Sequence, residues 1–239
     1  MPDHQSVIKR MQAQVSAWEK TADRRTIFLS CYMLMTGNML KALEKGEFND
    51  TRWVSELLHR FADYYFTALE QYEQDYQSSP LVWQLAFNAT QEPGKLVLQD
   101  LILGVNAHIN YDLVITLVDM LEPEWGELSK DGLKERYTDH CHVNDIIGRT
   151  IDTVQDQIIE QTEPAMKFID LALGPIDEWM TSRLITHWRE EVWQNALQMI
   201  ETANPGEREQ KRQQIEVNAL ERGKAILFRD ASGGISSLI

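Results

Sequence analysis

Apolar residues recur every three to four positions along nearly the whole chain, and alternation with a period of two is almost absent. Near the start, for example, Val7, Met11, Val15 and Trp18 fall on one face of a helix. A period of 3.6 residues is typical of an amphipathic α-helix that buries one side. The sequence therefore predicts an all-α protein.

Turn-forming residues divide this pattern into about eight or more helices. Proline and glycine stand at several of the divisions, as in residues 92–94 and 204–206. We expect N-caps at Thr21 or Asp23 and in the cluster 49–51. Residues 125–138 are interpreted as a polar connection with one short helix. The expected helices are residues 7–18, 21–45, 51–77, a short one around 83–87, 95–121, 139–161, a short one between 164 and 174, 176–202 and 207–222.

None of these turns has the composition of an interdomain linker. Residues 1–222 are therefore expected to form a single-domain multi-helix bundle, and residues 223–239 a loosely held tail. A chain of 239 residues is long enough to bury a sizeable core without disulfides or a structural metal.

The chain is acidic, with 37 Asp and Glu against 23 Lys and Arg and a formal net charge of −14. Nucleic acids and anionic membrane surfaces bind basic faces, so neither is expected as a partner. A small-molecule ligand or substrate, a metal ion or another protein is compatible with this charge, and a homo-oligomer is left open.

Compartment signals favour the cytoplasm. Cys31 and Cys141 lie far apart without CxxC spacing, which indicates a reducing environment and not a disulfide framework. The first residues lack the basic and apolar regions of a signal peptide. No segment is expected to reach the ~20 apolar residues of a membrane-spanning helix.

Three histidines in expected helices are each followed by an acid four residues later. This spacing places both side chains on one helical face, about 5–6 Å apart at Cβ. An imidazole and a carboxylate so placed can share a metal ion, or the carboxylate can orient the imidazole. The pairs are His59 with Asp63, His108 with Asp112 and His187 with Glu191.

The pair His108 and Asp112 is the strongest candidate, because it lies in the middle of the most apolar segment of the chain. Buried polar groups cost several kcal/mol unless each finds a partner. A hydrogen bond that fixes helix packing and a metal-binding or catalytic role are equally compatible with the pair. The other two pairs are interpreted as solvated, the His187 pair at the surface.

Residues 139–145 form a second group rich in potential ligands, at the expected start of a helix. One interpretation is capping by Asp139 together with surface histidines, which we favour for His140. The other is that one or two of these side chains join His108 and Asp112, which stays open for Asp139, His142 and Asn144.

Several of these segments together resemble the family catalogued as domain of unknown function 5995. The match spans residues ~25–200, and its most specific part is residues 106–113. The resemblance implies no particular activity. The resemblance implies that five residues occupy the signature positions of the family: His108, Asp112, Asp139, Asn144 and Arg189. The segments that resemble the family are residues 61–65, Trp83 with 86–87, 103–113, 139 with 144–146, and Arg189 with Trp193.

Three functions follow as hypotheses. The first is a metal-dependent enzyme with hydrolase-like chemistry on a small molecule, in which His108 and Asp112, joined by Asp63, Asp139 or His142, hold a divalent zinc, iron or manganese ion. The second is metal-free: His108, held by Asp112, acts as a general acid or base, and Arg189 recognises an anionic group. The third is a non-enzymatic ligand-binding or structural protein whose polar network only specifies packing.

Overall fold

The computed structural model describes residues 4–154 and 178–227, and these residues contain helices and no strand. The all-α fold predicted from the sequence is confirmed. The α-helices are α1 (His4–Glu19), α2 (Thr26–Glu44), α3 (Thr51–Gln74), α4 (Leu81–Ala89), α5 (Val97–Ala107), α6 (Leu113–Leu121), α7 (Lys130–Val154), α10 (Glu178–Glu201) and α11 (Pro205–Leu227), with single 3₁₀ turns at Tyr76–Ser78 and Glu122–Glu124 and a π-helical turn, η2, at His108–Asp112.

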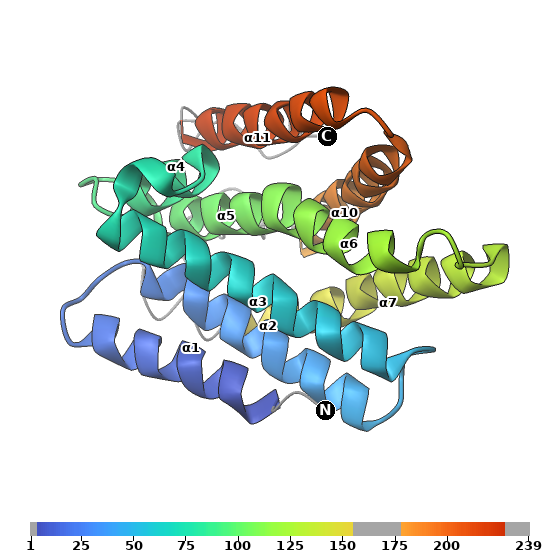
Figure 1. The fold of residues 1–239 in the computed structure, drawn as a ribbon. Coiled ribbons are helices and arrows are strands. Elements are labelled where there is room, and N and C mark those ends of the chain that lie inside the picture. Colours follow the sequence, from blue (N-terminus) through green and yellow to red (C-terminus); the bar gives the residue numbers. More distant parts are fainter. Residues whose placement is uncertain (1–3, 155–177, 228–239) are drawn as a thin grey trace.

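The helix α5, the π turn η2 and the helix α6 form one continuous rod through the centre of the molecule (Figure 1). The rod contacts α2, α3, α4, α10 and α11. Within residues 101–118, the only Asp, Glu, Lys or Arg is Asp112. Because this segment is apolar on all sides, other helices can pack against every face of it. Burial of its apolar surface favours that packing.

The rod together with the 3₁₀ turn that follows it, Val97–Glu124, is long and apolar enough to cross a membrane by length and composition, and 78% of its most apolar stretch is buried within the fold. The expectation that no segment reaches such a composition was therefore too strict. Burial by neighbouring helices on most sides is what a core helix shows.

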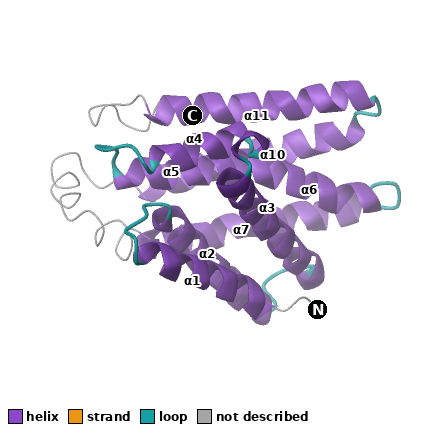
Figure 2. Ribbon diagram, turned by 60° about the vertical axis from the view of Figure 1, so that its left-hand side comes forward, coloured by secondary structure: helices purple, strands orange, loops and turns teal. Residues whose placement is uncertain are grey.

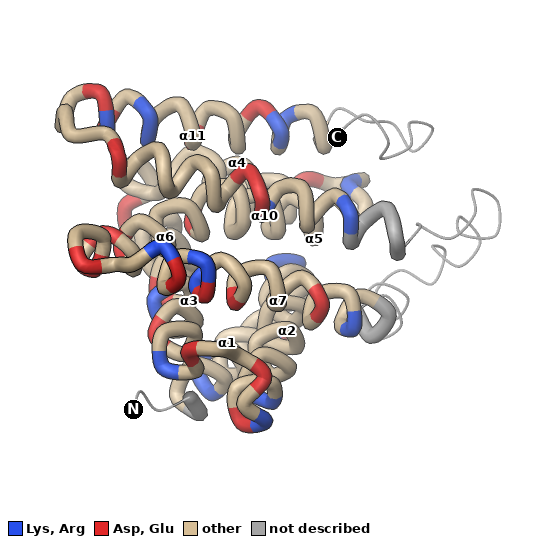
Figure 3. The backbone as a smooth tube through the Cα atoms, turned by 90° about the vertical axis from the view of Figure 1, so that its right-hand side faces the viewer, with Lys and Arg blue, Asp and Glu red and all other residues tan. Residues whose placement is uncertain are grey.

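The remaining helices cover the rod in two groups (Figures 1 and 2). On one side α1 packs on α2 and α3, and its predicted apolar face of Val7, Met11, Val15 and Trp18 is buried. On the other side α10 packs on α6 and α7, and α11 packs on α4 and α5. Acidic and basic residues lie along the outer helices α7 and α11 (Figure 3).

Helix α11 is part of the domain. The Asn106 side chain donates a hydrogen bond from Nδ2 to the Ala219 carbonyl at 2.8 Å. Ala219 and Ile226 are buried, so the helix continues past the end expected near Arg222 to Leu227. The sequence had left open whether this charged helix docks on the domain or on a partner.

Some element boundaries differ from the sequence predictions. Asp50 caps α3 as expected, accepting from the Trp53 N–H at 2.9 Å. The N-cap of α2 is Arg25 and not Thr21 or Asp23. The Asp23 carboxylate lies just before the helix and accepts from both the backbone N–H and the guanidinium of Arg25.

Helix α7 begins at Lys130, within the segment expected to be a connection. Tertiary contacts explain the earlier start, since Arg136 bridges Asp50 and Glu124 and thereby ties the first turns of α7 to the fold. The end of the expected helix 139–161, the short helix between 164 and 174 and the tail beyond 227 lie outside the described residues.

Candidate functional site

The polar centre of the molecule is the pair His108 and Asp112, which the π turn places at the middle of the central rod. The Nδ1 atom of His108 lies 2.9 Å from Oδ2 of Asp112. The indole N–H of Trp83 donates to the same carboxyl group, with Nε1 at 3.1 Å from Oδ1 and 3.0 Å from Oδ2. The i,i+4 contact predicted from the sequence is therefore present, and it is buried.

Aromatic rings fix the His108 imidazole. The Phe61 ring stacks on it with centroids 3.5 Å apart and an interplanar angle of 6°, and the Tyr32 ring meets it edge-on at 4.3 Å. The Nε2 atom is buried, and no group of the described residues forms a hydrogen bond with it. One ring nitrogen is thus held, while the other has no partner in the part of the chain that the structure describes, which is uncommon for a buried polar atom.

Burial lowers the pKa of His108 well below its usual value. Burial likewise raises the pKa of Asp112, although the hydrogen bond from Trp83 acts against this shift. Burial thus disfavours a net charge on the pair of His108 and Asp112. A pair with no net charge holds two protons in total. One lies between Nδ1 and Oδ2. Because the Trp83 N–H already faces both carboxyl oxygens, we assign the second proton to Nε2 of His108.

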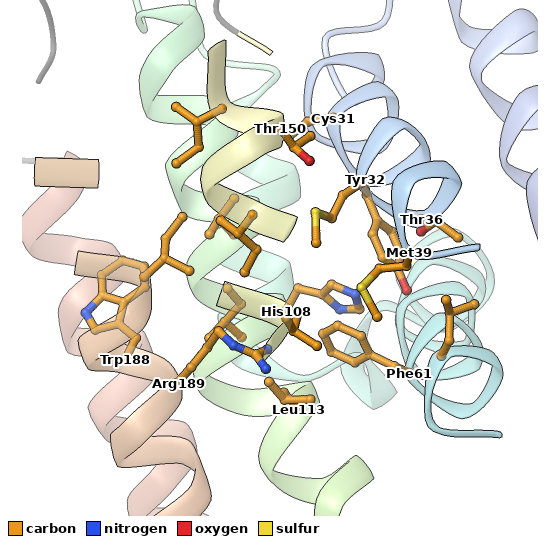
Figure 4. A pocket seen from close by; sticks show the side chains of 18 of the residues that line it. Cys31, Tyr32, Thr36, Met39, Phe61, His108, Leu113, Thr150, Trp188 and Arg189 are labelled. Atoms are coloured by element: carbon orange, nitrogen blue, oxygen red, sulfur yellow. The ribbon is translucent and has the colours of Figure 1, made fainter. Parts of the chain in front are cut away.

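Next to this pair lies a cavity of about 210 Å³ between the central rod and helices α2, α3, α7 and α10 (Figure 4). Its walls are mainly aliphatic and aromatic, with Phe61 and Tyr32 beside His108. The cavity exceeds the ~150 Å³ that suffices for benzene in an engineered protein core. A mainly apolar space with few polar groups is typical of a small-molecule site.

Arg189 of α10 lines the same cavity and is only 5% exposed. Its Nε donates to Oδ1 of Asn144 at 2.8 Å and its Nη2 to the His140 carbonyl at 2.7 Å. Burial lowers the pKa of Arg189 to about 10, which leaves it a cation at neutral pH. Of the three predicted catalytic residues, His108 and Arg189 line this cavity, and Asp112 contacts His108.

His140 supports this arginine. It is 4% exposed, so the prediction that it lies at the surface was wrong. Its Nε2 lies 3.0 Å from the Arg189 carbonyl and its Nδ1 lies 3.3 Å from Nη2 of Arg189. Nε2 therefore donates and Nδ1 accepts, which makes the ring neutral. Burial and the charge of Arg189 lower the pKa of His140 well below its usual value.

The other predicted metal ligands do not converge on His108. Asp139 lines the cavity, but its oxygens accept from the backbone N–H groups of Asn49 and Asp50, at the start of α3, and from the Asn49 side chain. Asp63 has a side chain that is 72% exposed and pairs with Arg10.

His142 is also held elsewhere, between Glu47 and Asp145. Among residues 4–154 and 178–227, no three His, Cys, Asp or Glu side chains are placed to hold one ion. The metal site of the first hypothesis stays a prediction.

The two weaker histidine pairs lie on the outside. The His187 side chain is 47% exposed and lies 3.6 Å from Glu191. His59 and Asp63 line a surface depression next to Asp119. Neither pair borders the cavity, whose lining includes none of these residues.

Sequence reasoning did not identify the contacts of Trp83 with Asp112 and of Phe61 with His108. Trp83 lies 29 residues before Asp112 in sequence, and no local pattern links an indole to a distant carboxyl group. An indole N–H buried in an apolar helix needs a hydrogen-bond acceptor. That requirement was the one feature of the sequence that pointed to a polar partner for Trp83.

A family model described as a family of unknown function, DUF5995, matches residues 4–228. The chain belongs to this family. The resemblance predicted from residues 103–113 and their companions is thus confirmed for DUF5995 over nearly the whole chain. No curated protein and no solved structure matches the chain.

Proposed function

We propose that the cavity is the active site for a small, mainly apolar organic molecule, and that His108 exchanges a proton with this molecule without the help of a metal. One observation carries the proposal: Nε2 of His108 is buried at a cavity wall without a partner among the described residues. A buried donor left unpaired costs about 1–3 kcal/mol. A ligand with a hydrogen-bond acceptor would remove that cost.

Three contacts suit His108 for proton transfer. Asp112 holds Nδ1 and supplies a site for a proton, Phe61 fixes the plane of the ring, and Trp83 orients the carboxyl group. When Nε2 gives its proton to a bound molecule, the shared proton moves fully onto Nδ1 and the charge left on the pair rests on Asp112. The indole N–H stabilises that charge.

The test uses protein with ¹⁵N-labelled histidine and cyclohexanone as the probe, a small apolar molecule with one carbonyl acceptor. We expect a protonated Nε2 signal for His108 that shifts as the ketone binds, and about tenfold weaker binding by His108→Phe, which keeps the ring stack but lacks Nε2. An Nε2 signal that saturating ketone leaves unmoved would contradict the proposal.

A pH titration of the same signal tests the acid–base role. Nε2 should lose its proton reversibly while the protein stays folded. If it keeps the proton up to the pH of unfolding, His108 serves only as a hydrogen-bond donor.

Elemental analysis of the untagged protein and of His108→Ala distinguishes the metal-dependent alternative from the metal-free proposal. Stoichiometric zinc, iron or manganese that the variant loses would overturn the metal-free proposal and restore the metal-dependent hydrolase.

A further inference from the structure

The side chain of Arg189 is a buried cation whose hydrogen-bond partners among the described residues are all neutral. Its Nε and Nη2 atoms bond to an amide oxygen, a backbone carbonyl and a neutral imidazole. No carboxylate of the described residues lies within ion-pair distance of its guanidinium, and Nη1 has no hydrogen-bond partner among them. A charge removed from water without a counter-ion costs several kcal/mol.

Three acids of the described residues that lie near Arg189 in the sequence or the cavity are engaged elsewhere. Asp139 lines the cavity but accepts from the backbone N–H groups of Asn49 and Asp50, just before α3. Glu190, the next residue along α10, accepts from the Tyr137 hydroxyl, and Glu191 pairs with Arg222. Arg189 is therefore a cation without a carboxylate partner among the described residues, in a cavity whose wall is mainly apolar apart from Asp139, His108 and His140.

From this we infer that the ligand of the cavity is a monocarboxylate with an apolar body, whose carboxylate pairs with Arg189. The inference rests on the proposed function, since it names the class of molecule on which His108 acts. Figure 4 shows the guanidinium extending from α10 toward Leu113 and His108. The Nε and Nη2 atoms of Arg189 already donate to Asn144 and His140, so the ligand carboxylate accepts a charge-assisted hydrogen bond from Nη1.

Charge and size restrict the ligand further. One carboxylate neutralises the single charge of Arg189 next to the net-neutral pair of His108 and Asp112, whereas a dianionic phosphate would leave a negative charge in an apolar space. Scaling from benzene in a ~150 Å³ cavity to the 210 Å³ found here gives a ligand of about eight to nine non-hydrogen atoms.

The experiment compares hexanoate with hexanamide, which has the same shape without the charge, by calorimetry near neutral pH. We expect hexanoate to bind about tenfold or more tightly. Arg189→Met should abolish this preference and Arg189→Lys should retain part of it. Arg52→Met, which removes the same charge from a side chain that is 86% exposed, should leave the preference intact.

Each contrary outcome has a distinct meaning. Equal binding of the two probes, a preference that survives in folded Arg189→Met, or tighter binding of hexyl phosphate would overturn the carboxylate assignment and leave the cavity as a binding site. Failure of both hexanoate and hexanamide to bind would overturn the proposed function, and the inference would fall with it.

Discussion

Two buried tryptophans allow the role of Trp83 to be measured. Trp83 is fully buried and donates its N–H to both oxygens of Asp112. Trp188 is 1% exposed, and its N–H has no hydrogen-bond partner among the described residues. The variants Trp83→Phe and Trp188→Phe remove the same atoms from equally buried positions, but only the first removes a hydrogen bond.

The loss of packing should be similar in the two variants, about 1–3 kcal/mol of unfolding free energy. Trp83→Phe also leaves the Asp112 carboxyl without its indole donor. That bond is worth ~0.5–1.5 kcal/mol if the acceptor is neutral and ~1.5–3 kcal/mol if it is charged. Since the Trp188 N–H is unpaired, its removal relieves a cost. We expect Trp83→Phe to be the less stable variant by about 1–3 kcal/mol.

Equilibrium unfolding in urea, followed by far-UV circular dichroism, gives both free energies. The ¹⁵N signal of His108 provides a second readout, because only Trp83→Phe should change the proton shared with Asp112. Equal losses of stability, with the His108 signal unchanged in both variants, would refute the role assigned to the indole.

Two further predictions concern stability. A Cβ at Gly104 would lie 2.8 Å or less from three atoms of Phe28, so Gly104→Ala should cost about 1–3 kcal/mol. A Cβ at Gly37 in α2 would meet nothing within 4 Å, so Gly37→Ala should add about 0.5–1 kcal/mol; thermal unfolding of both variants checks the opposite signs. The pKa of His140 is depressed in the folded protein, so below pH ~6.5 the unfolded chain takes up a proton that the folded chain does not, and the stability of the protein falls as the pH falls. This group should lower the free energy of unfolding by up to ~1.4 kcal/mol for each pH unit. His140→Gln should remove that part of the dependence of unfolding free energy on pH between pH ~5 and ~6.5. An unchanged pH dependence would contradict a buried, neutral His140.

Much of the fold follows from local pattern. The helical period places apolar faces correctly in α1 and in the central rod, and the spacing of His108 and Asp112 on a helix predicts their contact. Asp50 at the start of α3 is recognisable in the same way, since a cap acts on neighbours two or three residues away.

The missed features depend on contacts between distant segments. Residues 139–145 are polar enough to suggest a surface, yet α10 packs over them and buries His140 beneath Arg189. The indole of Trp83 finds its acceptor on another helix. Neither contact leaves a trace in local periodicity, because a single sequence carries no record of which helices pack together.

The π turn of the central rod has a consequence for how this family can vary. The Leu113 N–H bonds to the His108 carbonyl, five residues back, so the turn holds one residue more than an α-helical turn. In an α-helix an added residue rotates everything after it by ~100°, but here the wide turn absorbs the extra residue locally. Deleting one residue within 108–112 would therefore restore a plain α-helix while leaving the cores around α5 and α6 in register. Such a deletion should therefore remove the contact of His108 with Asp112 while the surrounding helices keep their packing.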